Sequence, residues 1–429
     1  MKKYIFPVVT ILLLGWLSCE EHLSETVSYW INEPVSMDAE VFRNSVKVTQ
    51  QVHEITGYGK ISYYNGYLYI SKPGKGIHII NNQHPEMPQK VGYIELLGNA
   101  DLSVHNNILY ADSYVDLVWF DVTNPALPEL KGRLENVFPG ALPFVDNEFG
   151  IDKEMSDSDK NKGKIIVGWE KVKRTVSMND NKGWFWKWLK GEDLALPEIN
   201  LDTNNGENSI KGSKPVFSLN GSWLYVIINN KLHTFDVKNQ RPELVGKIVS
   251  LGYNIDTIYS NGTSIFLGTP TCMPVYSVKD PINPIHQATI SNITSCNPFV
   301  VNDEVAYITF SSGNACNQSM NKLIVIDISD LSSTQANPEI IKTISLTSPQ
   351  GLAVDNHNLF VCDNGLKVFD INDIDIIDER SPEYFKDYKG YEVLLFNNVL
   401  MMIADDGIYQ YDYSDIQNIR KLSVLEIKN

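Results

Sequence analysis

The sequence is poor in basic residues and contains no familiar catalytic motif. Its 36 lysine and arginine residues are outnumbered by 52 aspartate and glutamate residues, which gives a formal net charge of -16 at pH 7. Nucleic acid is therefore not an expected partner, because a phosphate backbone is bound by basic surfaces. The chain has no Gly-x-Ser-x-Gly elbow, no His-Glu-x-x-His motif and no phosphate-binding glycine loop, and its eight histidines show no ligand spacing. The sequence thus assigns no catalytic residues, no metal site and no cofactor.

Long apolar runs are also absent, except at the N-terminus. Lys2 and Lys3 precede an uncharged run over residues 4–18, which is too short to span a bilayer but suits a secretory signal. No second apolar segment is long enough to cross a membrane. Residues 1–18 are therefore predicted to be a signal peptide.

The residues that follow this run resemble a lipoprotein processing site. Leu17-Ser18-Cys19 is similar to the lipobox of bacterial lipoproteins, in which the cysteine becomes the lipidated first residue. Glu20 and Glu21 resemble the acidic signal that sends some Gram-negative lipoproteins to the cell surface. The resemblance implies an outer-membrane protein, lipid-anchored through Cys19, with residues 19–44 as a tether. The alternative is an ordinary cleaved signal peptide with an incidental cysteine.

What the sequence does contain is one strand pattern, repeated many times. In Leu323-Ile324-Val325-Ile326-Asp327, β-favouring apolar residues lead to an aspartate and a polar turn, which is typical of a buried strand that ends abruptly. Variants of this pattern occupy residues 77–81, 117–121, 232–236, 274–277, 366–370 and 408–412. We expect the aspartate at the end of each such strand to accept backbone N–H groups from the following turn.

The spacing of the repeats predicts the architecture. Equivalent residues, five before the turn of each first hairpin, are Lys60, Asp101, Pro215, Asp256, Asn297, Gly351 and Glu392. The steps between them are 41, 114, 41, 41, 54 and 41 residues. A period near 40 with about four short strands is typical of a β-propeller. The prediction is an all-β propeller over residues 45–429, with seven blades of four antiparallel strands and an irregular insertion over residues 139–211.

Two features of this propeller stay open at the sequence level. An eighth, degenerate blade is the alternative count, with strands near residues 142–147 and 164–169. The ring must close so that no blade is left with an exposed edge. Either the last unit supplies all four of its strands, or a strand near residues 45–55 supplies or extends its outer edge.

The repeats resemble the LVIVD-repeat family, predicted propellers found mostly in secreted or lipid-anchored bacterial proteins. The resemblance covers roughly residues 58–429. It implies a fold and a surface location, and it transfers no activity and no catalytic residue.

Five polar residues at the equivalent positions are candidate ligand-binding residues. The innermost strands of a propeller surround a central channel, so these residues should lie on one rim and offer three carboxylates to a cation or polar ligand. They are Lys60, Asp101, Asp256, Asn297 and Glu392. The alternative is that they tie the backbone of one blade to the next or face water.

The insertion contains a run of aromatic residues, Trp184-Phe185-Trp186-Lys187-Trp188. On a strand, Trp184, Trp186 and Trp188 would share one face. Such a face could stack on sugar rings, bind a partner or contact a bilayer interface. The alternative is that these residues pin the insertion to the propeller wall.

Only four cysteines follow Cys19, and none forms a Cys-x-x-Cys pair, so a thiolate zinc site is not expected. Cys296 precedes the first strand of its blade, and Cys316 lies in the long loop between the second and third strands. Because both loops emerge on the same face of a propeller, the topology predicts a Cys296–Cys316 disulfide in an oxidising compartment. Cys272 and Cys362 are expected to be unpaired.

These features lead to two functional hypotheses. The first is a surface-anchored, non-catalytic propeller that binds or scaffolds a glycan, peptide or protein. The second is a propeller enzyme that acts on a polysaccharide or peptide, with Asp101, Asp256 and Glu392 as its carboxylates. An enzyme requires these carboxylates to lie within several ångströms of each other around an open pocket.

Overall fold

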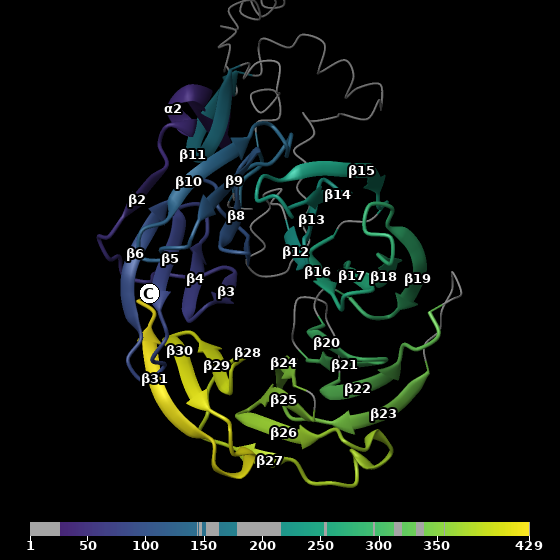
Figure 1. Cartoon of the computed structure of the whole chain (residues 1–429). Helices are drawn as coiled ribbons and strands as arrows, with labels where there is room; N and C mark the ends of the chain where they lie inside the picture. The colour runs from purple at the N-terminus through teal and green to yellow at the C-terminus, as the bar shows by residue number, and fades with distance from the viewer. Residues whose placement is uncertain are drawn as a thin grey trace, which may run out of the picture.

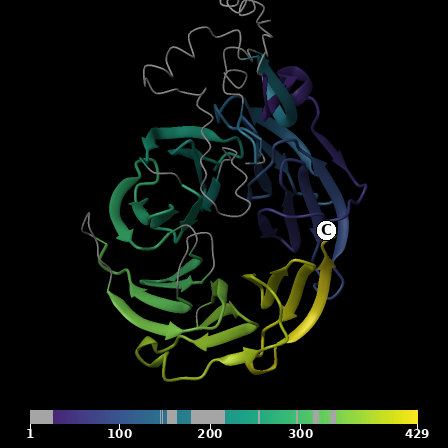
Figure 2. The ribbon, with the colours of Figure 1, turned by 180° about the vertical axis from the view of Figure 1, so that it is seen from behind.

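The structure is a ring of seven four-stranded units around a central axis, seen from two sides in Figures 1 and 2. It is a computed structural model of the whole chain. It describes residues 26–143, 145, 148–151, 163–177, 216–252, 255–294, 297–312, 320–331, 339–355 and 357–428. Each unit is an antiparallel sheet whose strands are ordered as in the chain. The predicted seven-blade β-propeller is confirmed.

The blades are numbered here in chain order, and each begins with its innermost strand. Blade 1 contains β3 (Ile61–Tyr64), β4 (Tyr67–Lys72), β5 (Gly76–Asn81) and β6 (Gln89–Glu95). Blade 2 contains β7 (Leu102–His105), β8 (Ile108–Ser113), β9 (Asp116–Asp121) and β10 (Glu129–Leu134). Blade 3 contains β12 (Val216–Asn220), β13 (Trp223–Ile228), β14 (Lys231–Asp236) and β15 (Glu243–Ser250).

The remaining blades follow without long interruptions. Blade 4 contains β16 (Thr257–Ser260), β17 (Ser264–Gly268), β18 (Cys272–Ser277) and β19 (Ile285–Ser291). Blade 5 contains β20 (Phe299–Asn302), β21 (Val305–Phe310), β22 (Lys322–Asp327) and β23 (Ile340–Ser345). Blade 6 contains β24 (Pro349–Val354), β25 (Asn358–Asp363), β26 (Leu366–Asp370), the 3-10 helix η3 (Ile374–Ile376) and β27 (Glu383–Phe385). Blade 7 contains β28 (Glu392–Phe396), β29 (Val399–Ala404), β30 (Gly407–Asp412), the 3-10 helix η4 (Ile416–Asn418) and β31 (Arg420–Glu426).

The second and third strands of each blade form the core. These strands have a sheet neighbour on each side and a blade against each face, so nearly every residue of β8 and β5 is buried. Continuous apolar runs suit such strands better than an alternating pattern does. The outer strands face solvent, and β15 is mostly exposed. This difference explains why the repeated motif is apolar at successive positions.

The aspartates that end the third strands behave as predicted. In each case a carboxylate oxygen accepts the backbone N–H of the residue two positions later, at 2.8–3.0 Å. The five residues are Asp121, Asp236, Asp327, Asp370 and Asp412. Asn81 makes the same contact in blade 1, at 3.1 Å. The hydroxyl and the backbone N–H of Ser329 lower the pKa of Asp327, and the backbone N–H of Asn372 lowers the pKa of Asp370, so these residues act in turn formation.

The ring closes through contacts between blades 7 and 1, and no strand is shared between them. Blade 7 takes all four of its strands from the last unit, the first of the two predicted arrangements. The short strand β2 (Lys47–Thr49) was the alternative candidate, and it instead pairs with β6 as a fifth strand of blade 1. Both views show the C-terminal blade beside the first one (Figures 1 and 2).

The segment predicted to be a tether is folded from Thr26 onward. Strand β1 (Thr26–Asp38) leads into the short helix α2 (Ala39–Arg43), so only residues 19–25 of the tether lie outside the described part. Phe42 of α2 packs with Tyr114 of blade 2 and Ile165 in a small apolar cluster.

No helix among the described residues is both long enough and apolar enough to cross a membrane.

The described part of the insertion forms no eighth blade. Strand β11 (Lys164–Ser177), which contains the predicted third strand of that blade, pairs with β1 in a separate two-stranded ribbon. The start of the insertion packs between two blades, because Ala141 and the fully buried Phe138 just before the insertion join the apolar cluster shared by blades 2 and 3. The count of seven blades is therefore confirmed over the alternative of eight, and among the described residues the expected third strand of an eighth blade pairs with the N-terminal strand instead.

Candidate functional site

The five predicted rim residues lie at the start of inner strands, but their environments differ. Asp101 and Asn297 are buried, with exposed fractions of 8% and 3%. Asp101 accepts the backbone N–H of Leu102 at 2.7 Å and that of Phe217, in blade 3, at 3.0 Å. Asn297 donates its amide to the carbonyl of Thr309 at 3.1 Å. The Asp101 side chain therefore joins neighbouring blades, as the alternative interpretation expected.

Glu392 is partly buried at the seam between blades 6 and 7. Burial raises the pKa of its carboxyl, while the nearby Lys60 ammonium and the N–H of Val393 oppose the rise. A side chain at Gly351, the equivalent position in blade 6, would lie 2.7 Å from the Glu392 carboxylate. Lys60 and Asp256 are exposed. The structure thus brings Lys60 and Glu392 together, and it does not form an open ring of equivalent carboxylates.

Several predicted functional residues lie outside the described residues. They are Cys19, Trp184, Trp186, Trp188, Cys296 and Cys316. Cys272 and Cys362 are free, as expected. Among the residues that the structure does describe, no three histidine, cysteine, aspartate or glutamate side chains are grouped as a metal site.

A buried polar chain that the sequence did not predict runs from blade 1 into blade 2. The Ser71 hydroxyl donates to the Oδ1 atom of Asn99 at 2.7 Å, and the Asn99 amide donates to Asp112 Oδ1 at 3.1 Å. The same Asp112 oxygen accepts the backbone N–H groups of Ala100 and Asp101 at 2.8 and 2.9 Å. Asp112 Oδ2 is buried and has no hydrogen-bond partner among the described residues. Burial raises the pKa of Asp112 to about 8.

This pKa makes the stability of the protein depend on pH. The carboxyl of an unfolded chain loses its proton near pH 4, whereas Asp112 in the folded state keeps it up to about pH 8. Stability should therefore fall as pH rises between these values, by up to about 1.4 kcal/mol per pH unit. Asp112→Asn keeps the oxygen that accepts the N–H groups and removes the titration. In urea unfolding at pH 5 and pH 8, the wild type should lose stability relative to the variant, and parallel pH profiles would contradict the assignment.

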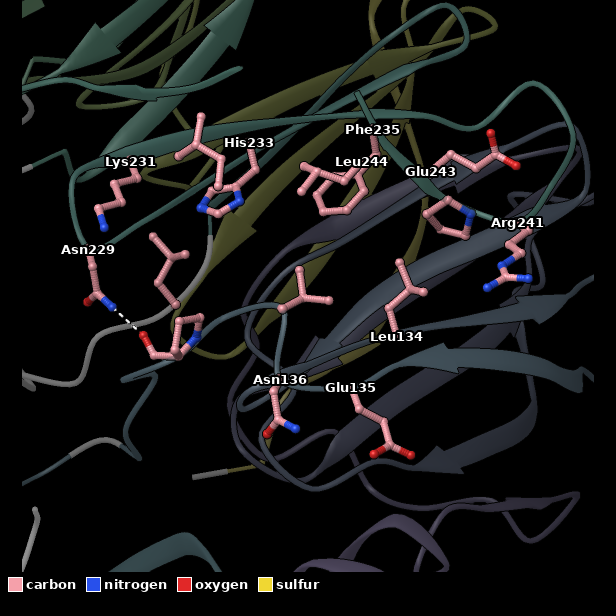
Figure 3. Close-up of a pocket in the computed structure, with 15 residues that line it drawn as sticks. Leu134, Glu135, Asn136, Asn229, Lys231, His233, Phe235, Arg241, Glu243 and Leu244 are labelled. Atoms are coloured by element: carbon pink, nitrogen blue, oxygen red, sulfur yellow. Dashed lines mark hydrogen bonds between the residues drawn. The ribbon is translucent and has the colours of Figure 1, made fainter. Parts of the chain in front are cut away.

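A groove lies on the outer wall, between blades 2 and 3 (Figure 3). It has a volume of about 790 Å³. One side is formed by the end of β10 and residues 135–139, and the other by β14 and β15. Its apolar lining includes Leu134, Val137, Ile228, Phe235, Leu244 and Ile248.

A bulge in the outer strand shapes this groove. The pairing of β14 with β15 shifts between Leu232 and Thr234, where residues 246–248 lie opposite His233. Gly246 permits the bulge because its φ angle is +67°, and an added Cβ atom would lie 1.9 Å from the carbonyl oxygen of Ile282 in blade 4. Leu244, before the bulge, and Ile248, within it, both line the groove and remain about half exposed.

Charged groups lie toward both ends of the groove, and Glu135 and Asn136 lie along one edge between them (Figure 3). Lys231 and His233 lie toward one end, and Arg241 and Glu243 lie at the other. His233 is only 6% exposed, and burial lowers its pKa. Its Nδ1 atom has no hydrogen-bond partner among the described residues. The sequence did not reveal this groove, because its lining comes from two blades that the insertion separates in the chain.

Comparisons with known proteins give no family and no function. No family model matches the chain, and no curated protein matches it. A solved protein from Lactobacillus plantarum is 9% identical, with 78% of this chain and 85% of that one covered and a TM-score of 0.47. Kluyveromyces lactis Hsv2p is 12% identical, with 86% and 97% covered and a TM-score of 0.46. The computationally designed Ika8 protein is 7% identical, with 88% of each chain covered and a TM-score of 0.46. The fold assignment therefore rests on the strand order of this chain itself.

Proposed function

We propose that the protein is a lipid-anchored propeller of the outer membrane, exposed at the cell surface, which binds a glycan, peptide or protein partner without catalysis. The processing site at Cys19 and the resemblance of the repeats to the LVIVD family support the anchored location. The propeller fold supports a binding role, because a rigid ring of blades presents loops and grooves from many strands.

The observation that most directly supports this proposal is the register of the two-stranded ribbon. Thr26 pairs with Ser177 at the end of the ribbon that is far from α2. Cys19 precedes Thr26 by seven residues, and Trp184 follows Ser177 by seven. The chain therefore leaves the ribbon at the same end toward Cys19 and toward Trp184.

This shared end of the ribbon suggests a role for the aromatic residues beside the anchor. Tryptophan is enriched where a bilayer meets water, and its ring also stacks on sugars. Trp184, Trp186 and Trp188 would then contact the anchoring membrane, or a partner held close to it, from the same end of the ribbon as the lipid.

The geometry favours binding over the enzyme alternative. An enzyme would need Asp101, Asp256 and Glu392 close together around an open pocket. Both carboxylate oxygens of Asp101 instead accept backbone N–H groups, and Asp256 is exposed while Glu392 is partly buried. The groove described above lies on the outer wall, away from the inner strands that carry these residues.

Two experiments test the anchor and the binding role separately. In cells given a fatty-acid analogue, the wild type should be labelled and Cys19→Ala should not, because only the cysteine thiol can carry the lipid. Equal labelling of both proteins would contradict the anchor.

The soluble chain of residues 20–429 is then applied to glycan and peptide arrays, where selective capture is expected. Failure to capture any array member would count against the binding role and leave the labelling result intact.

A further inference from the structure

We propose that the groove between blades 2 and 3 is a binding site for a small amphipathic anion, a molecule with one negatively charged head on an apolar body. The inference does not depend on the membrane anchor or on the partner proposed above. It rests on the shape of the groove, on its apolar middle and on the unequal charge of its two ends.

The middle of the groove suits an apolar body. Phe235 forms part of its floor, and Leu134 and Leu244 face each other across it (Figure 3). Leu244 is 50% exposed and Ile248 is 48% exposed, although both are aliphatic side chains beside a cavity. A ligand lying between these walls would remove their apolar surface from water, which favours binding. A volume of about 790 Å³ is within the range of small-molecule sites in proteins.

The charges indicate where the head of the ligand would lie. Lys231 forms no salt bridge with any described residue, and it lies near His233. The carboxylates of the lining belong to Glu243, at the opposite end, and to Glu135, which is paired with Arg43 at 2.6 Å. On a chain with a net charge of -16, this end of the groove is a local cationic position. An anionic head is therefore favoured beside Lys231.

His233 provides the second polar contact at this end. His233 is 6% exposed and lines the groove, and its Nδ1 atom has no hydrogen-bond partner among the described residues. An N–H group of its imidazole can donate to an anion that lies beside Lys231. The Lys231 ammonium and the His233 ring would together bind the anionic head, with the apolar body extending over Phe235 toward Arg241.

Two fluorescent probes that differ only in charge can test the site. 1-Anilinonaphthalene-8-sulfonate has an apolar aromatic body and one sulfonate, and N-phenyl-1-naphthylamine is the same molecule without the sulfonate. The soluble chain of residues 20–429 keeps every described residue and avoids detergent. We expect saturable binding of the sulfonate probe at one site, its displacement by dodecanoate, and weaker binding of the uncharged probe.

Substitutions then distinguish binding of the charged head of the probe from binding of its apolar body. Lys231→Gln should weaken binding of the sulfonate probe about tenfold, the usual effect of losing one charged hydrogen bond, and should leave the uncharged probe unchanged. Leu244→Asp should weaken both probes at least tenfold, because it places a carboxylate against the apolar body. Lys247→Gln is the matched control for Lys231→Gln, since Lys247 is on the neighbouring strand β15 and does not line the groove. Far-ultraviolet circular dichroism establishes that each variant is folded.

Three results would overturn the proposal. The first is no saturable binding of either probe to the wild type, which is also the result expected if residues 178–215 of the chain fill the groove. The second is an equal loss of affinity in Lys231→Gln and Lys247→Gln, which would show only a general effect of surface charge. The third is full binding by a folded Leu244→Asp variant, which would indicate adventitious binding of the probe elsewhere.

Discussion

Asp116→Ala is expected to lower the free energy of unfolding by about 3–5 kcal/mol, because it removes the central acceptor of a buried ionic cluster. The Asp116 side chain is fully buried and accepts hydrogen bonds from Arg43 Nε at 3.0 Å and Arg133 Nη1 at 2.8 Å. Its second oxygen accepts the N–H of Asn136 at 2.8 Å. Without the carboxylate, two largely buried guanidinium groups would lose their main partner.

The matched control for this prediction is Glu135→Ala. Glu135 pairs with the same Arg43 at 2.6 Å, but its side chain is 56% exposed. An exposed ion pair contributes at most about 1 kcal/mol, so the control should cost much less than Asp116→Ala in urea unfolding. Equal losses in the two variants would mean that burial of the cluster has little energetic effect.

The ionic cluster of Asp116, Arg43 and Arg133 also links the propeller to the proposed membrane anchor. Arg43 ends α2, which continues directly from the N-terminal strand β1. If Cys19 carries a lipid, the connection from the anchor to the propeller passes through β1 and α2 into Asp116 of blade 2. Loss of this carboxylate should then loosen the N-terminal segment as well as destabilise the ring.

Gln410→Ala is expected to cost about 2–4 kcal/mol, because it breaks the buried contact that closes the ring. The side-chain amides of Gln410 in blade 7 and Asn82 in blade 1 form two hydrogen bonds, at 2.9 and 2.8 Å. Gln410 is 0% exposed and Asn82 is 2% exposed. Alanine would leave both polar atoms of the Asn82 amide without these bonds and would create a cavity at the seam.

Thermal or urea unfolding measures this loss, and two further variants make the result specific. Asn397 donates to the Tyr63 hydroxyl across the same seam at 3.0 Å, but this contact is exposed, so Asn397→Ala should cost less than about 1 kcal/mol. The double variant Asn82→Ala with Gln410→Ala should cost less than the sum of the single variants, because each removes the same interaction. Additive losses would refute a direct coupling between the two amides.

The sequence alone determined the repeated parts of this protein. Each blade is encoded within about 40 residues, its core strands carry continuous apolar runs, and its hairpins need residues that fit tight turns. The aspartates that end the third strands act on a backbone N–H only two residues away. Local interactions of this kind leave a pattern in the chain, so the seven blades and the role of Asp121 and Asp327 could be predicted.

The candidate site could be predicted only in part. The spacing correctly located Lys60, Asp101, Asp256, Asn297 and Glu392 at the start of inner strands. It did not indicate which of these side chains are buried, since that depends on the neighbouring blade. Asp101 is buried where blade 2 meets blade 3, and its Oδ2 atom accepts the N–H of Phe217, 116 residues later in the chain.

Only the tertiary structure decided how distant segments meet. Strand β1 pairs with β11 across more than a hundred residues, so the expected tether is a folded ribbon from Thr26 onward, and the described part of the insertion forms no eighth blade. Asn82 meets Gln410 across 328 residues to close the ring. The groove likewise needs β10 and β15 from blades that the insertion separates. Such contacts arise from the closure of the ring and the packing of one blade on another, and periodicity within a blade carries no information about them.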